Sequence, residues 1–525
     1  MLDNKRIDLI KIAMKIKTKY ISTFGIALFS LVACSKFDEI NQDPNKTDEV
    51  NSAMLATNNI LGIIKKDIAD TKGFIQPFML GKYITWQEGQ ENYQYNKITR
   101  GNFDRMEVLR NVDLMIGYAE SDGLKNSYTA LGHFIRAWQF FILTMQMGDI
   151  PYSEAIKGES EGLIKPKYDT QKEVFLGILN ELDEANNLFA QGEDFAGDPI
   201  FGGKIDQWQR LVNSFELHVL MNLYKKTDDA DLKVVARFQE IVNNRPLMRN
   251  YDDNFALKYL DKDGQKYPWV NINSSNPFTI YPMLTANLID PLKAMHDRRL
   301  FYYAKPSAIK LKAGKLASDW DAYPAVEASA SFNSLQTIHA SKDFSDLNDR
   351  YADLFNAEPV GLFNYWDLQF ILAEASIRGW ITGDANGYYA AGIKASMDFL
   401  VHYTPESEKY HHNMEITNAY ISSYLSENAL SGGVEHQLEQ IITQKYLAGF
   451  LQDNDFNAWF ENRRTGYPKF ILNSSTNLND PTNAFPKRWL YPQKELENNG
   501  ENVAEAIQRQ FNGNDNVNQE MWILK

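Results

Sequence analysis

Residues 364–402 read NYWDLQFILAEASIRGWITGDANGYYAAGIKASMDFLVH. The first part spaces its apolar residues three or four apart, as one buried face of a helix requires: Trp366, Phe370, Ala373 and Ile377. Gly379 then marks a break, and a second helical pattern runs over residues 385–400. Two helices with so short a connection pack against each other. The stretch therefore predicts a helix–turn–helix pair.

The same periodicity recurs along the chain. It predicts helices over 51–69, 104–120, 127–147, 173–189, 206–224, 231–243, 280–296, 364–379, 385–402, 416–427 and 435–451. Around Gly379 the small and large residues loosely follow the tetratricopeptide pattern, but the match is degenerate and the pairs are unevenly spaced. We therefore predict a mainly α fold, an irregular scaffold of tetratricopeptide-like helical pairs, and not a regular repeat array.

Long stretches without helical period separate these helices. They cover 71–103, 146–168, 245–279, 301–360 and 462–520 and hold most of the prolines and many tryptophans. Such long connections are usually functional or carry short strands. The prediction is a loop-rich half with a few short strands. Because no linker divides the chain cleanly, residues 51–525 are expected to form a single domain.

Charge and composition exclude several function classes. The 525 residues carry 54 basic and 68 acidic side chains, a formal net charge of −14, which argues against a protein that binds nucleic-acid phosphates. The single cysteine excludes an intramolecular disulfide and a multi-cysteine metal site. The 10 Trp, 27 Tyr and 30 Phe amount to 13%, more than a core alone usually needs.

The N-terminus has the pattern of a lipoprotein signal. Six basic residues precede an apolar run, 21–33, that is too short to span a bilayer comfortably. The run ends in LVAC (31–34), which resembles a bacterial lipobox, and the acidic SKFDE (35–39) resembles a Bacteroidetes surface-export signal. We expect residues 1–33 to be a signal peptide, Cys34 to be lipidated and 34–50 to be a tether to the outer membrane. The alternative is a buried structural cysteine.

Seven motifs occur in an order that points to one family. They are NQDPN (41–45), GDIPY (148–152), KYD (167–169) before a helix, DRRL (297–300), LAEA with GW (372–375 and 379–380), EQIITQKY with AW and RRTGYP (439–446, 458–459 and 463–468), and Arg488 with YP and Glu495. Together they make the mature chain similar to the SusD/RagB family, in particular its second SusD-like branch. Arg298 stands where the family usually has proline.

The resemblance implies a function without catalysis or cofactor. Such proteins sit over a SusC-like TonB-dependent transporter in the outer membrane and hand it a nutrient, most often an oligosaccharide. A peptide ligand is the first alternative, and an envelope glycoside hydrolase is a remote one. The sequence contains no His-Glu-x-x-His, Gly-x-Ser-x-Gly or phosphate-loop motif, and its paired carboxylates are best interpreted as solvated surface.

Three polar, aromatic loops are the candidate ligand site. A sugar presents flat apolar faces rimmed by hydroxyls, so it needs an exposed aromatic platform with amide or charged groups beside it. The candidates are Trp86, Gln87, Asn92, Tyr93, Tyr95 and Asn96 in the first loop, Trp269, Asn271 and Asn273 in the second, and Trp320 and Tyr323 in the third. The alternative for each aromatic is packing against the helices or contact with the transporter.

Two further pairs of residues require an interpretation. His411 and His412 could bind a metal, but no third ligand lies at a suitable spacing, so a polar loop is the better interpretation and no metal site is assigned. Arg463 and Arg464, in the family signature, are expected to pair with acidic groups inside the fold.

Overall fold

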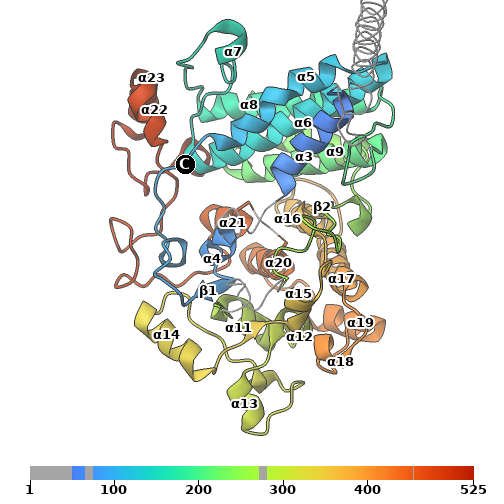
Figure 1. Cartoon of the computed structure of the whole chain (residues 1–525), viewed down its shortest axis with the longest axis vertical. Helices are drawn as coiled ribbons and strands as arrows, with labels where there is room; N and C mark the ends of the chain where they lie inside the picture. The colour runs from blue at the N-terminus through green and yellow to red at the C-terminus, as the bar shows by residue number, and fades with distance from the viewer. Residues whose placement is uncertain (1–49, 66–74, 271–280, 453–454) are drawn as a thin grey trace, which may run out of the picture. The chain divides into compact units, whose positions relative to one another are not determined.

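Three long amphipathic helices build the first layer of the structure. The computed structural model describes residues 50–65, 75–270, 281–452 and 455–525. In it α6 (Asp122–Met147) lies against α8 (Gln171–Phe189), and α8 against α9 (Ile205–Asn222) (Figure 1). The helix α8 begins with a capping box in which Thr170 and Glu173 each accept a hydrogen bond from the other's backbone N–H. This layer confirms the predicted helical scaffold.

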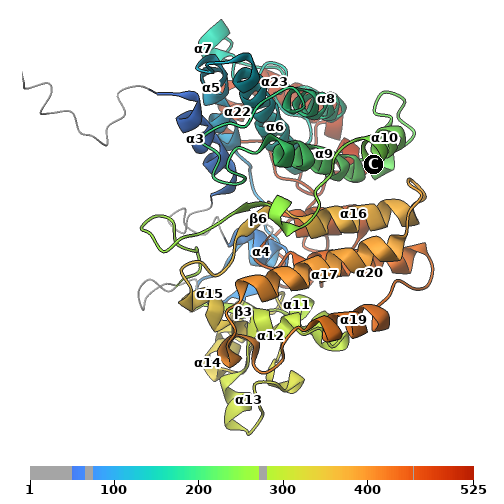
Figure 2. The ribbon, with the colours of Figure 1, turned by 90° about the vertical axis from the view of Figure 1, so that its right-hand side faces the viewer.

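The helix–turn–helix pair predicted from residues 364–402 is present. It consists of α16 (Tyr365–Ile377) and α17 (Ala385–Tyr403), and Figure 2 shows α20 (Val434–Ala448) alongside them. A Cβ on Gly392 would lie 2.8 Å from the Phe370 ring. The glycine therefore lets α16 and α17 approach closely. The helix α16 is buried on nearly every side, and its buried residues include the polar Asp367, Gln369 and Glu374.

The remaining helices lie along the rest of the chain. They are α3 (Ser52–Ile64), α4 (Gln76–Leu80), α5 (Val112–Gly117), α7 (Gly158–Glu161), α10 (Val234–Asn244), α11 (Ala286–Ala294), α12 (Arg299–Tyr303), α13 (Ala308–Lys312), α14 (Phe332–Ser341), α15 (Asp349–Asp353), α18 (Glu408–His411), α19 (Asn418–Glu427), α21 (Asn457–Thr465), α22 (Gln493–Asn498) and α23 (Gly500–Phe511), with 3₁₀ turns η3 (Tyr93–Tyr95), η4 (Asp104–Asn111), η5 (Tyr224–Lys226), η6 (Tyr251–Asp253), η8 (Trp320–Ala322) and η9 (Trp522–Leu524). Residues Ser52–Lys525 cluster as one unit. None of the helices in the described part of the chain has the length and apolar character needed to cross a bilayer.

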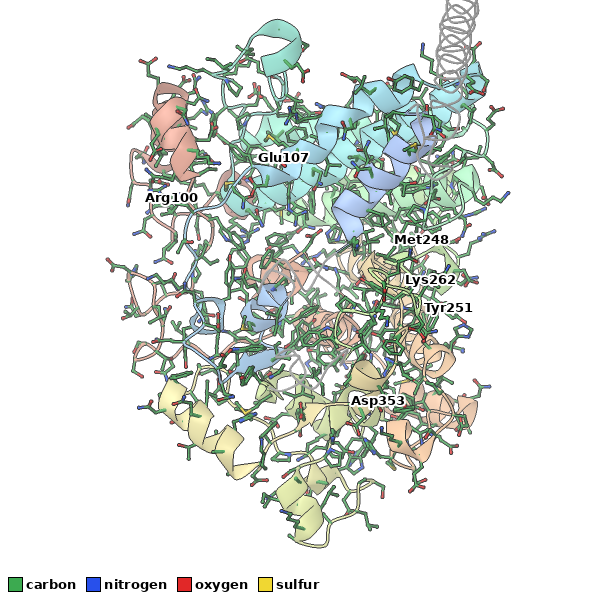
Figure 3. The ribbon with its side chains drawn as sticks, viewed as in Figure 1. Arg100, Glu107, Met248, Tyr251, Lys262 and Asp353 are labelled. Atoms are coloured by element: carbon green, nitrogen blue, oxygen red, sulfur yellow. The ribbon has the colours of Figure 1, made fainter. Side chains whose placement is uncertain are left out.

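Short strands join segments that are far apart in the sequence. Three antiparallel pairs form among the described residues: β1 (Ile84–Trp86) with β3 (Pro282–Leu284), β2 (Phe255–Leu257) with β6 (Val360–Phe363), and β4 (Ala304–Lys305) with β5 (Asp346–Leu347). Just before β2, the Tyr251 ring packs on Phe399 of α17 at 6.2 Å (Figure 3). The predicted few short strands are thus confirmed, and they pair segments in or beside the loop-rich stretches with one another.

The loop prediction was wrong where helices form within the predicted loops, and α14 and α23 are the longest of these helices. Residues 332–341 and 500–511 lie in stretches expected to lack helical period, yet they form α14 and α23. In α23 Val503, Ala506 and Phe511 are buried on one face, a short stripe within a polar sequence. In α14 only Leu335 is buried, so the apolar pattern is too weak to recognise. Conversely, the helix predicted from residue 280 begins only at Ala286, because Pro282–Leu284 pair as β3.

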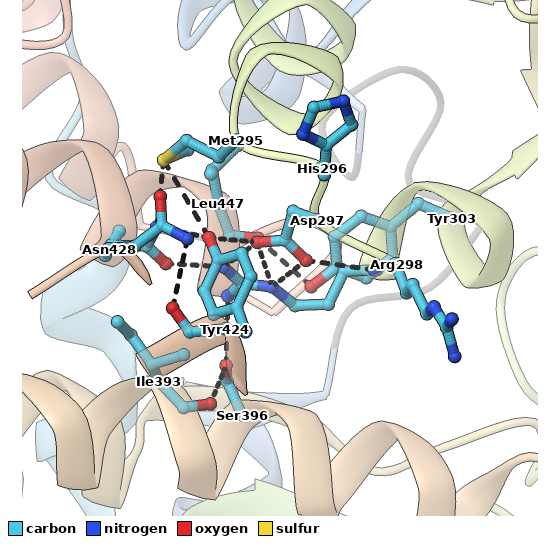
Figure 4. Close-up of polar contacts among 12 residues, drawn as sticks. Met295, His296, Asp297, Arg298, Tyr303, Ile393, Ser396, Tyr424, Asn428 and Leu447 are labelled. Carbon is cyan, nitrogen blue, oxygen red and sulfur yellow. Dashed lines mark hydrogen bonds and ion pairs between the residues drawn. The ribbon is translucent and has the colours of Figure 1, made fainter. Parts of the chain in front are cut away.

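A buried ion pair ties four helices together. The Arg299 guanidinium and the Asp297 carboxylate are both fully buried, and the Arg299 Nε lies 3.1 Å from Asp297 Oδ1. Tyr424 of α19 donates to Asp297 at 2.8 Å (Figure 4), Ser396 of α17 accepts from Arg299 at 3.0 Å, and Gln444 of α20 also accepts from Arg299. Burial by itself would lower the pKa of Arg299, but the Asp297 charge overcomes this effect and raises it.

A second buried cluster joins α16, α20 and α21. Arg464 donates to both oxygens of Glu374 at 2.6 and 2.7 Å and to Glu461, which also accepts from Lys445 at 2.8 Å. The expected pairing of Arg464 with acidic groups is confirmed. The same expectation was wrong for Arg463, because no carboxylate among the described residues lies within ion-pair distance of it. Its guanidinium instead donates to the Lys487 carbonyl and stacks over Trp459 at 4.5 Å.

We predict that Asp297→Asn lowers the free energy of unfolding by about 3–5 kcal/mol, because it leaves the buried Arg299 cation without its counter-charge. The matched control is Asp398→Asn, which removes an exposed ion pair between neighbouring turns of α17 and should cost less than about 1 kcal/mol. Urea titrations followed by tryptophan fluorescence measure both. Equal losses in the two variants would contradict a structural role for the buried pair.

Candidate ligand-binding site

The β1–β3 pair brings the first predicted loop beside Tyr281, the residue that precedes β3. Trp86 lies opposite Pro282 in the register, and the Trp86 ring is 5.4 Å from the half-buried Tyr281 ring. Asn271 and Asn273 belong to the second loop but lie outside the described residues. The first loop and Tyr281 therefore share one edge of the structure, although they are almost 200 residues apart in the sequence.

The loop after β1 is closed by a buried glutamine. The Gln94 side-chain oxygen accepts a hydrogen bond from the Thr85 hydroxyl at 2.7 Å and another from the Trp86 backbone N–H. The start of the loop is thereby hydrogen-bonded to the side chain of Gln94, which lies near its end. The side chain of Gln87 is half-buried and that of Asn92 is exposed, so their amides are available at the surface. An exposed amide of this kind can pair with a ligand hydroxyl.

A buried lysine lies at the base of the same loop. The Lys82 ammonium donates to the Gln94 carbonyl at 2.6 Å, and the Lys82 side chain is buried. Burial lowers the pKa of Lys82 from an ordinary 10.5 to about 7, and the negative charge of Glu327 offsets only part of that effect. The loop base therefore contains a group that titrates near neutral pH.

Tyr93 connects the loop to the C-terminal segment. Its half-buried ring stacks on Phe456 with centroids 6.0 Å apart, and its hydroxyl accepts a hydrogen bond from the Trp489 indole at 3.3 Å. Trp489 in turn packs edge-on against Trp459 at 4.9 Å. Tyr93 thus presents part of its ring to the surface, while the tryptophans behind it are buried.

Several predicted site residues lie inside the fold. The buried ones are Trp86, Tyr95, Asn96, Trp269 and Tyr323, each with at most 4% of its surface exposed. Tyr95 belongs to a small core with Met283 and Val326, and the Tyr323 hydroxyl donates to the Ala317 carbonyl at 2.7 Å. These side chains pack in the interior beneath the surface of the loops. Ligand contact at the predicted positions stays a prediction.

Trp320 occupies a different part of the structure. Its half-buried ring packs on Phe301 at 4.7 Å and on His296 at 5.6 Å. Phe301 belongs to α12 and His296 precedes it, so the ring partners of Trp320 lie beside α12 and not on the β1–β3 edge. These contacts therefore do not place the third predicted loop beside Trp86.

A cavity that the sequence did not indicate lies between η4 and the loop 151–166. Its volume is about 680 Å³, within the range of small-ligand sites. Its apolar lining includes Phe103, Met106 and Ile156. The lining also contains four acidic residues, among them Glu107 (labelled in Figure 3) and Glu495, and the basic Arg110. These segments are distant in the sequence and share no period. No local signal could therefore have predicted that they meet.

Comparison with known proteins places the chain among outer-membrane binding proteins. Residues 44–492 match the SusD-like_2 family, described as starch-binding and associating with the outer membrane. The crystal structure of a SusD homolog from Bacteroides fragilis is 43% identical, with a TM-score of 0.87, over 91% of this chain and 100% of that chain. An outer membrane protein of Bacteroides vulgatus that has been linked to nutrient binding is 32% identical, with a TM-score of 0.81, over 91% and 100%.

A more distant comparison shows the fold alone. A chitin-binding SusD homolog from Flavobacterium johnsoniae is 22% identical, with a TM-score of 0.69, and covers 90% of this chain and 98% of that chain. No curated protein matches the chain. The helical scaffold and short strands described above are therefore a fold shared across several outer-membrane proteins.

The buried Lys82 predicts a pH dependence of stability. Its pKa in the folded chain is about 7, below the ordinary 10.5, so between these values the unfolded chain binds more protons. The free energy of unfolding should then rise with pH from about 7 to 10. Lys82→Met should reduce this slope by up to about 1.4 kcal/mol per pH unit. The control is the exposed Lys97, changed to Met, and equal slopes in both variants would contradict the prediction.

Proposed function

The chain belongs to the SusD-like family of outer-membrane nutrient-binding proteins, and on this premise we propose that it captures an oligosaccharide at the cell surface and delivers it to a SusC-like TonB-dependent transporter. The premise rests on the family match over residues 44–492 and on the relatives at 43% and 32% identity. SusD-like proteins are binding proteins without catalytic activity. The family description, which names starch, supports a glycan as the ligand.

The proposed ligand surface is the β1–β3 edge, made of Gln87, Asn92, Tyr93 and Tyr281. Support comes from its chemistry, because half-buried tyrosine rings offer apolar faces to a sugar and neighbouring carboxamides offer donors and acceptors to its hydroxyls. Gln94 and Lys82 hold the loop from beneath. Little backbone ordering would then be needed on binding, which favours affinity.

We expect starch-derived oligosaccharides such as maltoheptaose to bind, and Asn92→Ala or Tyr281→Ala to weaken the binding at least 10-fold. The reason is that each variant removes a hydrogen-bonding or stacking group from the proposed surface. Isothermal titration calorimetry with a panel that also includes chitin and peptidoglycan fragments measures this. The control is Asn58→Ala, an exposed asparagine on α3. A glycan whose affinity is unchanged in both site variants would contradict the assignment of this surface.

A peptide ligand is the second candidate, and the cavity beside η4 favours it. An apolar lining that includes four carboxylates and one arginine suits a peptide that carries apolar and basic side chains. In that case a basic, apolar peptide would quench tryptophan fluorescence while the glycan panel gave no heat. Charge reversal by Glu107→Lys would then abolish the quenching and leave glycan titrations unchanged.

The proposed anchor and partner give a cellular prediction. Cys34 lies outside the described residues, and its lipidation is inferred from the sequence alone. The wild-type chain should fractionate with the outer membrane and co-purify with a large β-barrel in mild detergent. Cys34→Ser should remove the chain from the outer-membrane fraction, because the lipid is its anchor in this proposal. Full membrane retention of that variant would contradict the anchor, and isolation of the wild type without any barrel would contradict the partner.

A further inference from the structure

His411 is a buried histidine without a hydrogen bond. It is the last residue of α18, only 4% of it is exposed, and among the described residues neither ring nitrogen has a hydrogen-bond partner. Leaving a buried polar group unpaired costs free energy, so native structures seldom do it without a reason. The neighbouring His412 bonds to the backbone of Ala304 and packs near Tyr323, so within the described part of the chain only its Nε2 lacks a hydrogen-bond partner. In His411, by comparison, both ring nitrogens lack one there.

Two glutamates converge on this imidazole. Glu406 precedes α18, and its Oε1 lies 3.4 Å from His411 Nε2. After α18 the backbone turns through two left-handed residues, His412 with φ 51° and Asn413 with φ 61°, and this turn brings Glu415 back towards His411. One ligand atom from each of His411, Glu406 and Glu415 lies within 4.8 Å of the other two. The cluster thus combines a buried nitrogen with two exposed carboxylates.

The basic side chains nearest to the two carboxylates bond to other groups. Lys409 pairs with Asp353, whose position is labelled in Figure 3, and the Arg298 guanidinium bonds to the Glu415 backbone carbonyl at 2.6 Å. Among the residues that the structure describes, neither Glu406 nor Glu415 forms an ion pair with a lysine or arginine. Two like charges beside an unpaired imidazole are unfavourable alone and would be stabilised by a shared cation.

We propose that His411, Glu406 and Glu415 bind a Zn²⁺ ion. Zinc accepts imidazole nitrogen and carboxylate oxygen together in tetrahedral sites, with a water able to fill the fourth position. Calcium and magnesium prefer all-oxygen sites, so the histidine argues against them. Zinc–ligand bonds of about 2.0–2.2 Å require the three atoms to come closer than 4.8 Å, and the exposed glutamates are free to make that movement.

The site would cross-link the connection between α17 and α19. Glu406 lies before α18 and Glu415 after it, so one ion would hold both ends of that short helix. The sequence did not reveal this site because the ligand spacing follows no metal motif and depends on the left-handed turn at His412 and Asn413. The inference is independent of the nutrient that the protein binds.

The test is a zinc titration of the full chain, purified in detergent through a non-histidine tag and stripped of metal with a chelator. We expect calorimetry to give one Zn²⁺ per chain, with at least a 10-fold loss of affinity in Glu406→Gln and in Glu415→Gln. Both glutamates are exposed, so these variants should fold even if a His411 variant does not. The control is His436→Gln, which removes an exposed histidine 3.9 Å from Glu439 and should leave zinc binding unchanged.

Three outcomes would overturn the proposal. They are an absence of zinc binding, equal zinc affinity in the wild type and the Glu406→Gln Glu415→Gln double variant, and a preference for Ca²⁺ over Zn²⁺. Cobalt supplies a second readout, because Co²⁺ bound in a zinc site has a visible absorption spectrum that aqueous Co²⁺ lacks. That spectrum should form in the wild type and in His436→Gln and should be missing in the double variant.

Discussion

The buried pair of Arg299 and Asp297 is the contact on which the arrangement of the helices depends. A guanidinium without solvent must be neutralised and must have its N–H groups bonded. Here Ser396 of α17 and Gln444 of α20 accept from Arg299, while Tyr424 of α19 donates to the Asp297 carboxylate. Arg464 plays the same part for α16, α20 and α21. Because α20 takes part in both clusters, a shift of this helix would break two buried networks at once.

The ligand surface that we propose follows from that framework. The strand β3 leads directly into α11 and α12, and its pairing with β1 carries the first loop to the same edge as Tyr281. The aromatic excess of the sequence then divides into two groups. Trp86, Trp269 and Tyr323 fill the interior beneath loops, whereas Tyr93, Tyr281 and Trp320 keep part of their rings exposed. An aromatic residue in a polar loop is therefore compatible both with packing in the interior and with exposure at the surface.

Local rules predicted the helices well and the polar contacts poorly. The pair α16–α17 and the helices α6, α8 and α9 were predicted because each buries a long apolar stripe, while α14 buries one residue and escaped notice. Arg463 and Arg464 are adjacent and chemically identical, yet only Arg464 meets carboxylates. Likewise, two histidines in a polar stretch did not indicate a metal site until the turn at His412 brought Glu415 near Glu406.

The sequence by itself determined the fold class, the family and the expected N-terminal signal, because periodicity and ordered motifs are local properties that survive without coordinates. Only the tertiary structure decided which loop aromatics are buried and where the cavity beside η4 opens. It also decided that Glu406 and Glu415 converge on His411. The physical reason is that burial and polar pairing depend on neighbours from distant segments, and a linear pattern of residue types does not specify which segments meet.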